Sequence, residues 1–180
     1  MPDSMKKTVL TFGLISGAVS IATMLAALPF EDKIGHDKAE ILGYTIIVLS
    51  ALLVFFGIRS YRENVGGGRL SFGRGFAVGI LITLISSACY VGTWEIVYFK
   101  FMPDFAVKYG AQMVERAKAS GASQQKIAEA EQQAKEFKQA YDNPLINMAY
   151  TFMEVFPVYL VVTTVSAGIL RKKVREPSSP

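Results

Sequence analysis

The chain has 180 residues, of which 51% are hydrophobic and only 19% are charged, with a formal net charge of +4. A soluble domain of this length spreads its charges more evenly along the sequence, so the clustering of charge found here argues against one. The basic residues lie beside apolar segments, and this position explains the positive charge better than nucleic-acid binding does.

Four segments are almost free of charge, and only the last of them contains an acidic residue, Glu154. About 20 apolar residues, at 1.5 Å each, cross a hydrocarbon core of about 30 Å as a helix. Helices are required because each segment must satisfy its own backbone hydrogen bonds in lipid. The sequence therefore predicts an all-α membrane protein with four transmembrane helices in a single domain. The predicted spans are about residues 8–30, 39–58, 75–99 and 144–170.

The first span is predicted to be retained rather than cleaved. Lys6 and Lys7 resemble the basic start of a signal peptide. However, the apolar stretch is longer than a signal core of about 7–15 residues, and no clean A-x-A cleavage site follows it.

Basic residues mark one side of the predicted bundle. They are concentrated before the first span, between the second and third spans, and after the fourth span. Basic residues close to span ends favour the cytoplasmic side of a membrane. We therefore predict that both termini are cytoplasmic.

Local signals indicate where the predicted helices begin. Asp37 and Glu40 have the spacing of a capping box before the second span. Asn143 followed by Pro144 is typical of the start of a helix, here the fourth span. Aromatic residues at the outer ends of the last two spans are typical of a membrane interface. These are Trp94, Tyr98, Phe99, Tyr150 and Phe152.

Residues 104–141 are predicted to form an extracytoplasmic helical hairpin between the third and fourth spans, with the stretch SGAS at 120–123 as its turn. Ser123 is the expected N-cap of the second arm. Both arms carry apolar residues at helical spacing, and we expect these stripes to pack on each other. Binding of a partner or of the membrane surface is the alternative. The stripes are Tyr109, Met113 and Ala117, and Ile127, Ala130, Ala134, Phe137 and Tyr141.

Two carboxylates are the candidate functional groups. Glu154 lies 17 residues before Arg171, about 25 Å along a helix and therefore near the outer boundary of the membrane core. Glu95 lies 21 residues beyond Arg74, about 31 Å, which places it at the outer interface. We expect a structural or interfacial role for Glu154, beside a proline, Pro157, that can kink the helix. An ion or proton path is the alternative, since acidic residues in spans often mark one.

Two pairs of glycines predict close helix packing. Gly13 and Gly17 form a GxxxG motif near the inner end of the first span, and Gly75 and Gly79 form another near the inner end of the third. The shared depth indicates that these spans touch, or that one of them drives dimerisation.

The connection GGGRLSFGRG at 66–75 resembles a phosphate-binding loop but lacks the Lys-Ser/Thr ending and the preceding strand. A flexible turn is therefore expected. Basic residues in and before this connection are predicted to contact anionic lipid headgroups. They are Arg59, Arg62, Arg69 and Arg74.

Catalysis has little support. His36 is the only histidine, and with Asp32 and Asp37 it does not supply the three or four ligands usual for a metal. Cys89 is the only cysteine and is expected to be inert packing within the third span. No metal, cofactor or nucleophile–base pair is expected.

Several stretches resemble the Domain of Unknown Function 4199 (DUF4199) family of small bacterial integral membrane proteins. They include FFGIRSYR, PDF and TFMEVFPV, and the resemblance covers nearly the whole chain. It implies a bacterial membrane protein with four spans and a polar outer insertion, and it implies no reaction or ligand.

Three functions remain open. The first is a non-enzymatic inner-membrane protein that scaffolds or regulates a membrane protein partner. The second is a small oligomeric transporter or channel-like subunit that uses Glu154 and Glu95. A membrane enzyme is the third and least favoured. Membrane lipid is an expected partner in each case, a homo-oligomer is open, and nucleic acid is not expected.

Overall fold

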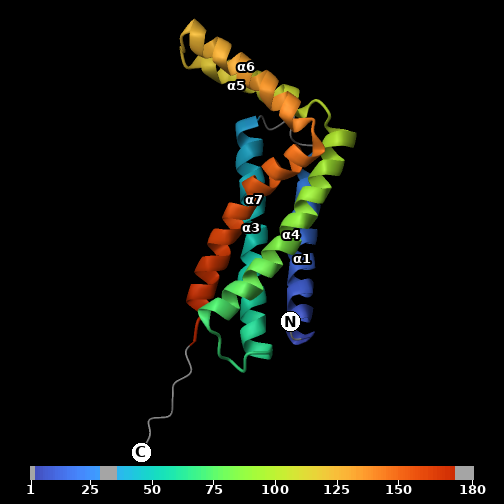
Figure 1. Ribbon diagram of the computed structural model, residues 1–180, viewed down its shortest axis with the longest axis vertical. Helices are drawn as coiled ribbons and strands as arrows, with labels where there is room; N and C mark the ends of the chain where they lie inside the picture. Colours follow the sequence, from blue (N-terminus) through green and yellow to red (C-terminus); the bar gives the residue numbers. More distant parts are fainter. Residues whose placement is uncertain (1–2, 29–35, 173–180) are drawn as a thin grey trace, which may run out of the picture. The chain divides into compact units, whose positions relative to one another are not determined.

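The computed structural model describes residues 3–28 and 36–172, apart from the side chains of residues 36–40. Within these ranges the chain forms six helices and a single isolated backbone bridge. The helices are α1 (Asp3–Ala27), α3 (His36–Asn64), α4 (Phe72–Phe101), α5 (Phe105–Ala119), α6 (Gln124–Tyr141) and α7 (Pro144–Leu170). Figure 1 shows them along the chain.

Four of these helices are long and apolar enough to cross a membrane, namely α1, α4, α7 and the part of α3 from Ile41 to Asn64. Only 33–44% of the most apolar stretch of each is buried within the protein. Large apolar side chains such as Leu49 and Val161, 58% and 62% exposed, therefore face outward. Apolar surface of this extent is unfavourable in water and suits lipid. The structure confirms the all-helical class with four candidate membrane spans.

The helix α3 continues past the charge-free part of its span, to Asn64. Arg59 and Glu63 are one turn apart and form an ion pair of 3.0 Å, which supports the added turn. The capping box expected at Asp37 and Glu40 lies outside the described side chains, although the helix already begins at His36.

The chain divides into two compact units. The first comprises residues 1–90 and 154–180, and the second comprises residues 91–153. In the first unit α1 packs against α3, and one core joins the spans. Its buried residues include Val9, Ile47, Val54, Ile58, Val78, Ile82, Val155 and Tyr159.

The second unit contains the predicted helical hairpin, formed by α5 and α6. The chain reverses at Gly121, whose φ of 71° is in the left-handed region that favours glycine. The Ser123 hydroxyl accepts a hydrogen bond from the Lys126 amide, so the predicted N-cap is confirmed. The arms approach closely where Gly110 faces Ala134, because a Cβ atom at Gly110 would lie 2.9 Å from the Ala134 Cβ. The two arms therefore pack on each other, as expected.

Candidate functional sites

A cluster of hydroxyl groups lies at the centre of the first unit, on residues that the sequence analysis did not single out. We call it the hydroxyl cluster. All its members are at most 3% exposed, and each lies near the middle of its helix. The members are Ser16 and Ser20 of α1, Ser50 of α3, Ser86 of α4 and Tyr159 of α7.

The hydrogen bonds of the hydroxyl cluster connect all four membrane helices. Ser16 donates its hydroxyl proton to the Ser50 carbonyl at 2.9 Å, and Ser20 donates to the Ser16 carbonyl at 3.0 Å. The Ser86 hydroxyl is 2.9 Å from both the Ser16 and the Tyr159 hydroxyls. Since Ser16 has used its proton, Ser86 donates to Ser16, and Tyr159 then donates to Ser86. The chain of donation runs from Tyr159 through Ser86 and Ser16 to the Ser50 carbonyl.

This arrangement suits helix association. Lipid offers no hydrogen-bond partner to a hydroxyl group, so hydroxyls in the spans bond across helices instead. Each such hydrogen bond contributes about 0.6 kcal/mol on average to the stability of a membrane protein. The Ser50 Oγ atom is buried and has no hydrogen-bond partner among the described residues. A buried water molecule is the usual partner of such an atom. The sequence feature that could have predicted the hydroxyl cluster is the presence of serines near the middle of the charge-free spans.

The second pair of glycines lies where α4 meets α3 and α7. A Cβ atom at Gly79 would lie 2.7 Å from Thr163 of α7 and 2.8 Å from Ile58 of α3. A Cβ atom at Gly75 would lie 3.0 Å from the Leu70 side chain. One turn from Gly79, the hydroxyls of Thr83 and Thr163 are 3.0 Å apart and fully buried.

The first pair of glycines lies where α1 meets α4. A Cβ atom at Gly13 would lie 2.9 Å from Ile85, and one at Gly17 would lie 2.8 Å from the Cβ of Cys89. The two spans therefore touch, but Gly13 and Gly17 face Ile85 and Cys89 near the middle of α4. They do not face the glycines at the start of that helix.

Glu154 lies on the outside of the first unit. Its side chain is exposed, as is its neighbour Met153, whereas Val155 is 1% exposed and faces the core. The helix α7 continues without interruption past Pro157, which is also exposed. Glu154 therefore lies on the outer surface of α7 and not inside this unit.

Glu95 has the opposite environment, within the second unit. The residue is 9% exposed, and its Oε1 atom is buried without a hydrogen-bond partner among the described residues. A buried carboxylate oxygen normally accepts a hydrogen bond, from protein or from water. This observation makes Glu95 a stronger candidate for binding a proton or cation than its predicted depth indicated.

Aromatic and polar groups join the hairpin to the ends of the spans within the second unit. The Trp94 indole donates to the Tyr141 hydroxyl at 2.9 Å, and the Tyr98 hydroxyl donates to Asp142 Oδ1 at 2.8 Å. Lys138 pairs with the other oxygen of Asp142. The Lys138 ammonium, with the Tyr98 hydroxyl second, holds the pKa of the Asp142 carboxyl below its ordinary value of 3.8.

The start of α7 is held in the same unit. The Asn143 side chain accepts from the amides of Leu145 and Ile146, at 3.0 and 3.4 Å, so the predicted N-cap is confirmed. The Asn147 amide donates to the Tyr141 carbonyl at 3.1 Å, which ties α7 to the end of α6. The hairpin and the adjoining ends of α4 and α7 are thus one connected structure.

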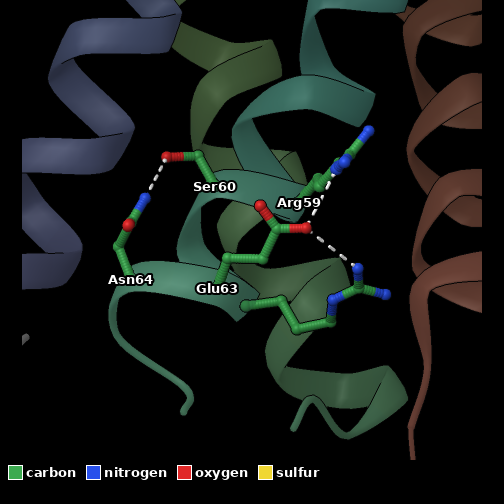
Figure 2. A network of polar contacts seen from close by, with 5 residues as sticks. Arg59, Ser60, Glu63 and Asn64 are labelled. Atoms are coloured by element: carbon green, nitrogen blue, oxygen red, sulfur yellow. Dashed lines mark hydrogen bonds and ion pairs between the residues drawn. The ribbon is translucent and has the colours of Figure 1, made fainter. Parts of the chain in front are cut away.

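The arginines predicted to contact lipid fall into two groups. Figure 2 shows Arg59 beside Glu63. The Glu63 Oε1 atom accepts hydrogen bonds from Arg59 at 3.0 Å and from Arg62 at 3.2 Å. In the same figure the Asn64 amide donates to the Ser60 hydroxyl. The other group, Arg69 and Arg74, is exposed.

Asp32 lies outside the described residues, and so does the side chain of His36. Across the described residues, no three His, Cys, Asp or Glu side chains come together in a group that could hold a metal ion. Cys89 is partly buried and contacts the α1 helix at Gly17.

The sequence was also compared with known proteins. A family model described as "Protein of unknown function (DUF4199)" matches residues 11–172, which is nearly the whole chain. No curated protein matches, and no solved structure matches. The match agrees with the resemblance found in the sequence and supplies no reaction, ligand or partner.

Proposed function

The chain belongs to the DUF4199 family of proteins of unknown function, and from that premise we propose that it is a non-enzymatic protein that scaffolds or regulates a membrane partner. We place it in the bacterial inner membrane, with both termini in the cytoplasm and the α5–α6 hairpin outside. The basic residues beside the spans support this orientation.

The proposal rests on one observation, the preorganised hairpin of the second unit. Its apolar stripes are used internally, since Tyr109 and Phe137 pack with ring centroids 5.1 Å apart and Tyr141 is 6% exposed. The bonds of Tyr98 and Trp94 hold it to the ends of the spans. A surface that is already ordered loses little conformational entropy when it binds a partner.

The surface that remains available on α6 is polar. Its exposed residues are Gln and charged side chains of both signs, together with Ala128. A polar surface of this kind does not suit insertion into lipid, so it is left to contact water or a protein partner. The exposed polar and charged positions are Gln124, Gln125, Lys126, Glu129, Glu131, Gln132, Gln133, Lys135, Glu136 and Gln139.

Photocrosslinking in the native membrane tests the proposal. A photoreactive amino acid at Gln133, which is exposed on α6, is expected to trap one defined protein, identified by mass spectrometry. The same amino acid at Leu49, exposed on a span, is the control and is expected to trap lipid. Capture of lipid alone, or of unrelated proteins in changing proportions, from Gln133 would contradict the proposal.

The buried state of Glu95 favours a second function, an oligomeric transporter or channel-like subunit. Four spans of this apolarity offer few polar groups to line a pore, so several copies are required. In sealed vesicles that contain the purified protein, Glu95→Gln is expected to abolish a proton- or cation-dependent flux if this function is correct. Glu154→Gln is the matched variant on the exposed surface. An absence of flux in the wild-type protein would remove this function and leave the scaffold.

A further inference from the structure

Four exposed basic residues lie on the chain segments that meet where the connection between α3 and α4 joins the end of α7. We call this group the basic corner; it consists of Arg69, Arg74, Arg171 and Lys172. The backbones of Leu70 and Lys172 form an antiparallel bridge there. Its two hydrogen bonds, from each amide to the other residue's carbonyl, measure 3.3 and 3.0 Å. Figure 1 shows the end of α7 beside the start of α4.

The connection is a turn, as expected from the sequence, and its conformation depends on three glycines. Gly67 and Gly68 have φ angles of 57° and 78°, and the Arg69 amide donates to the Gly66 carbonyl at 3.0 Å. A Cβ atom at Gly66 would lie 2.3 Å from the Arg69 carbonyl oxygen, so only glycine fits there. Leu70 is 2% exposed and anchors the connection in the core. Arg69 is therefore held near the end of α7.

Exposure shows which residues of these segments face outward. Leu70 is 2% exposed and faces the core, whereas Arg69, Arg171 and Lys172 are exposed. Arg74, in the first turn of α4, is also exposed, and the next residue, Gly75, lies near Leu70 and near Ala167 of α7. Three neighbouring chain segments thus carry exposed basic residues.

Among the residues that the structure describes, no acidic side chain neutralises the charge of the basic corner. Arg59 and Arg62 share the carboxylate of Glu63. In contrast, none of the four basic residues of the corner pairs with an acidic side chain among the residues that the structure describes. The amino-terminal end of α4 adds the positive end of its helix dipole. Phe72, 40% exposed, stacks on Phe76 at the same end, as aromatic residues do at a membrane interface.

We propose that the basic corner binds the phosphate group of an anionic phospholipid, and that Arg59 and Arg62 are not the contacts. Guanidinium groups bind phosphate oxygens in pairs, and the ammonium of Lys172 adds a third donor group. The bridge between Leu70 and Lys172 makes the site, because it brings the backbone beside Arg69 close to the backbone beside Arg171, although the two are far apart in the sequence. The proposal does not depend on the function of the hairpin.

Lipid binding to the purified full-length protein tests this site. The protein in uncharged detergent is titrated with phosphatidylglycerol or with phosphatidylcholine of the same acyl chains, and bound lipids are counted by native mass spectrometry. Wild-type protein is expected to prefer phosphatidylglycerol. Arg69→Gln with Arg171→Gln is expected to reduce that preference by about 25-fold, on the scale of surface basic residues near anionic lipid. Arg69→Lys with Arg171→Lys is expected to retain most of it.

The matched control is Arg59→Gln with Glu63→Gln, which removes one charge of each sign from α3 and is expected to leave the preference unchanged. If the double variant of the corner unfolds, Lys172→Gln alone is used, since Lys172 follows the end of α7 and its backbone is unaffected. An equal loss in the control, or no preference in the wild-type protein, would overturn the proposal. Competition by inorganic phosphate at millimolar concentration would also overturn it, in favour of a soluble anion.

Discussion

The Tyr159 hydroxyl of α7 lies 2.9 Å from the Ser86 hydroxyl of α4, near the middle of both helices. Through Ser16 this contact reaches α1 and the backbone of α3, so one phenol group completes a connection among four spans. No charged residue takes part in it. The hydroxyl cluster therefore joins the four spans through hydroxyl groups and one backbone carbonyl.

Replacement of Tyr159 by Phe tests this contact. The variant retains the ring and loses the hydroxyl, so unfolding in detergent is expected to become easier by about 0.6–2 kcal/mol. Tyr150→Phe is the control, because Tyr150 is exposed and lies in the second unit. Unfolding of the purified protein by a graded denaturing detergent gives the free energies. Equal stability of Tyr159→Phe and wild type would show that the cluster contributes nothing.

The contact of Gly17 with Cys89 predicts a steric effect. In Gly17→Ala the new Cβ atom would lie 2.8 Å from the Cys89 Cβ, so α1 and α4 must move apart. We expect this overpacking to lower the free energy of unfolding by about 1–3 kcal/mol. Gly92→Ala, also on α4, meets no atom within 4 Å and is expected to be neutral or slightly stabilising. Thermal unfolding compares the two. Adding Cys89→Gly to Gly17→Ala is expected to restore part of the loss, and a failure to do so would place the strain elsewhere.

The Asp142 carboxylate predicts an acid-sensitive hairpin. Its pKa in the folded state is lowered from 3.8 by the Lys138 ammonium and the Tyr98 hydroxyl. The charged form therefore stabilises the fold at every pH above 3.8, and this contribution is lost as the pH falls through the lowered pKa. Trp94 is the only tryptophan and bonds to Tyr141, so its fluorescence reports opening of this unit.

We expect the Trp94 signal of the wild-type protein to change only below pH 3.8, because the lowered pKa keeps the Asp142 carboxyl charged down to that pH. Asp142→Asn removes the charge, and its signal is expected to be already shifted at neutral pH and to depend less on pH. Asp104→Asn, on an exposed acid of the same unit, is the matched control. The same acid transition in Asp142→Asn and wild type would contradict the assignment.

The N-cap of α6 predicts a local effect. Ser123→Ala removes the acceptor of the Lys126 amide and is expected to destabilise the hairpin by about 0.5–2 kcal/mol. Ser123→Asp retains an acceptor and is expected to keep most of the stability. Amide hydrogen exchange at Lys126 measures the effect directly. Unchanged protection of Lys126 in Ser123→Ala would show that packing of the arms alone holds this turn.

Local features of the sequence were enough to predict the caps and the hairpin. Ser123 and Asn143 cap helices because their short side chains reach amides two or three residues away, and this needs no tertiary information. The apolar stripes of the hairpin repeat at helical spacing, and SGAS interrupts them. The structure agrees with both. The side of the membrane on which the hairpin lies stays a prediction.

Contacts between distant residues could not be predicted in the same way. The glycine pairs predicted that the first and third spans touch or that one of them drives dimerisation, but they did not predict that Gly17 meets Cys89. Glu154 was the leading carboxylate, yet it is exposed and Glu95 is buried. The depth of a residue along a helix follows from counting residues. The direction of its side chain does not, because successive side chains point about 100° apart and the rotation of the whole helix is set by the neighbouring helices.

The sequence alone therefore determined that the chain is helical, that four helices are apolar enough to span a membrane, and that Ser123 and Asn143 cap α6 and α7. These properties follow from hydrophobic patterning and from interactions within about one helical turn. Only the tertiary structure decided that Tyr159 completes a hydroxyl cluster and that Leu70 pairs with Lys172. Such contacts join residues far apart in the chain, and only packed helices of fixed rotation bring them together.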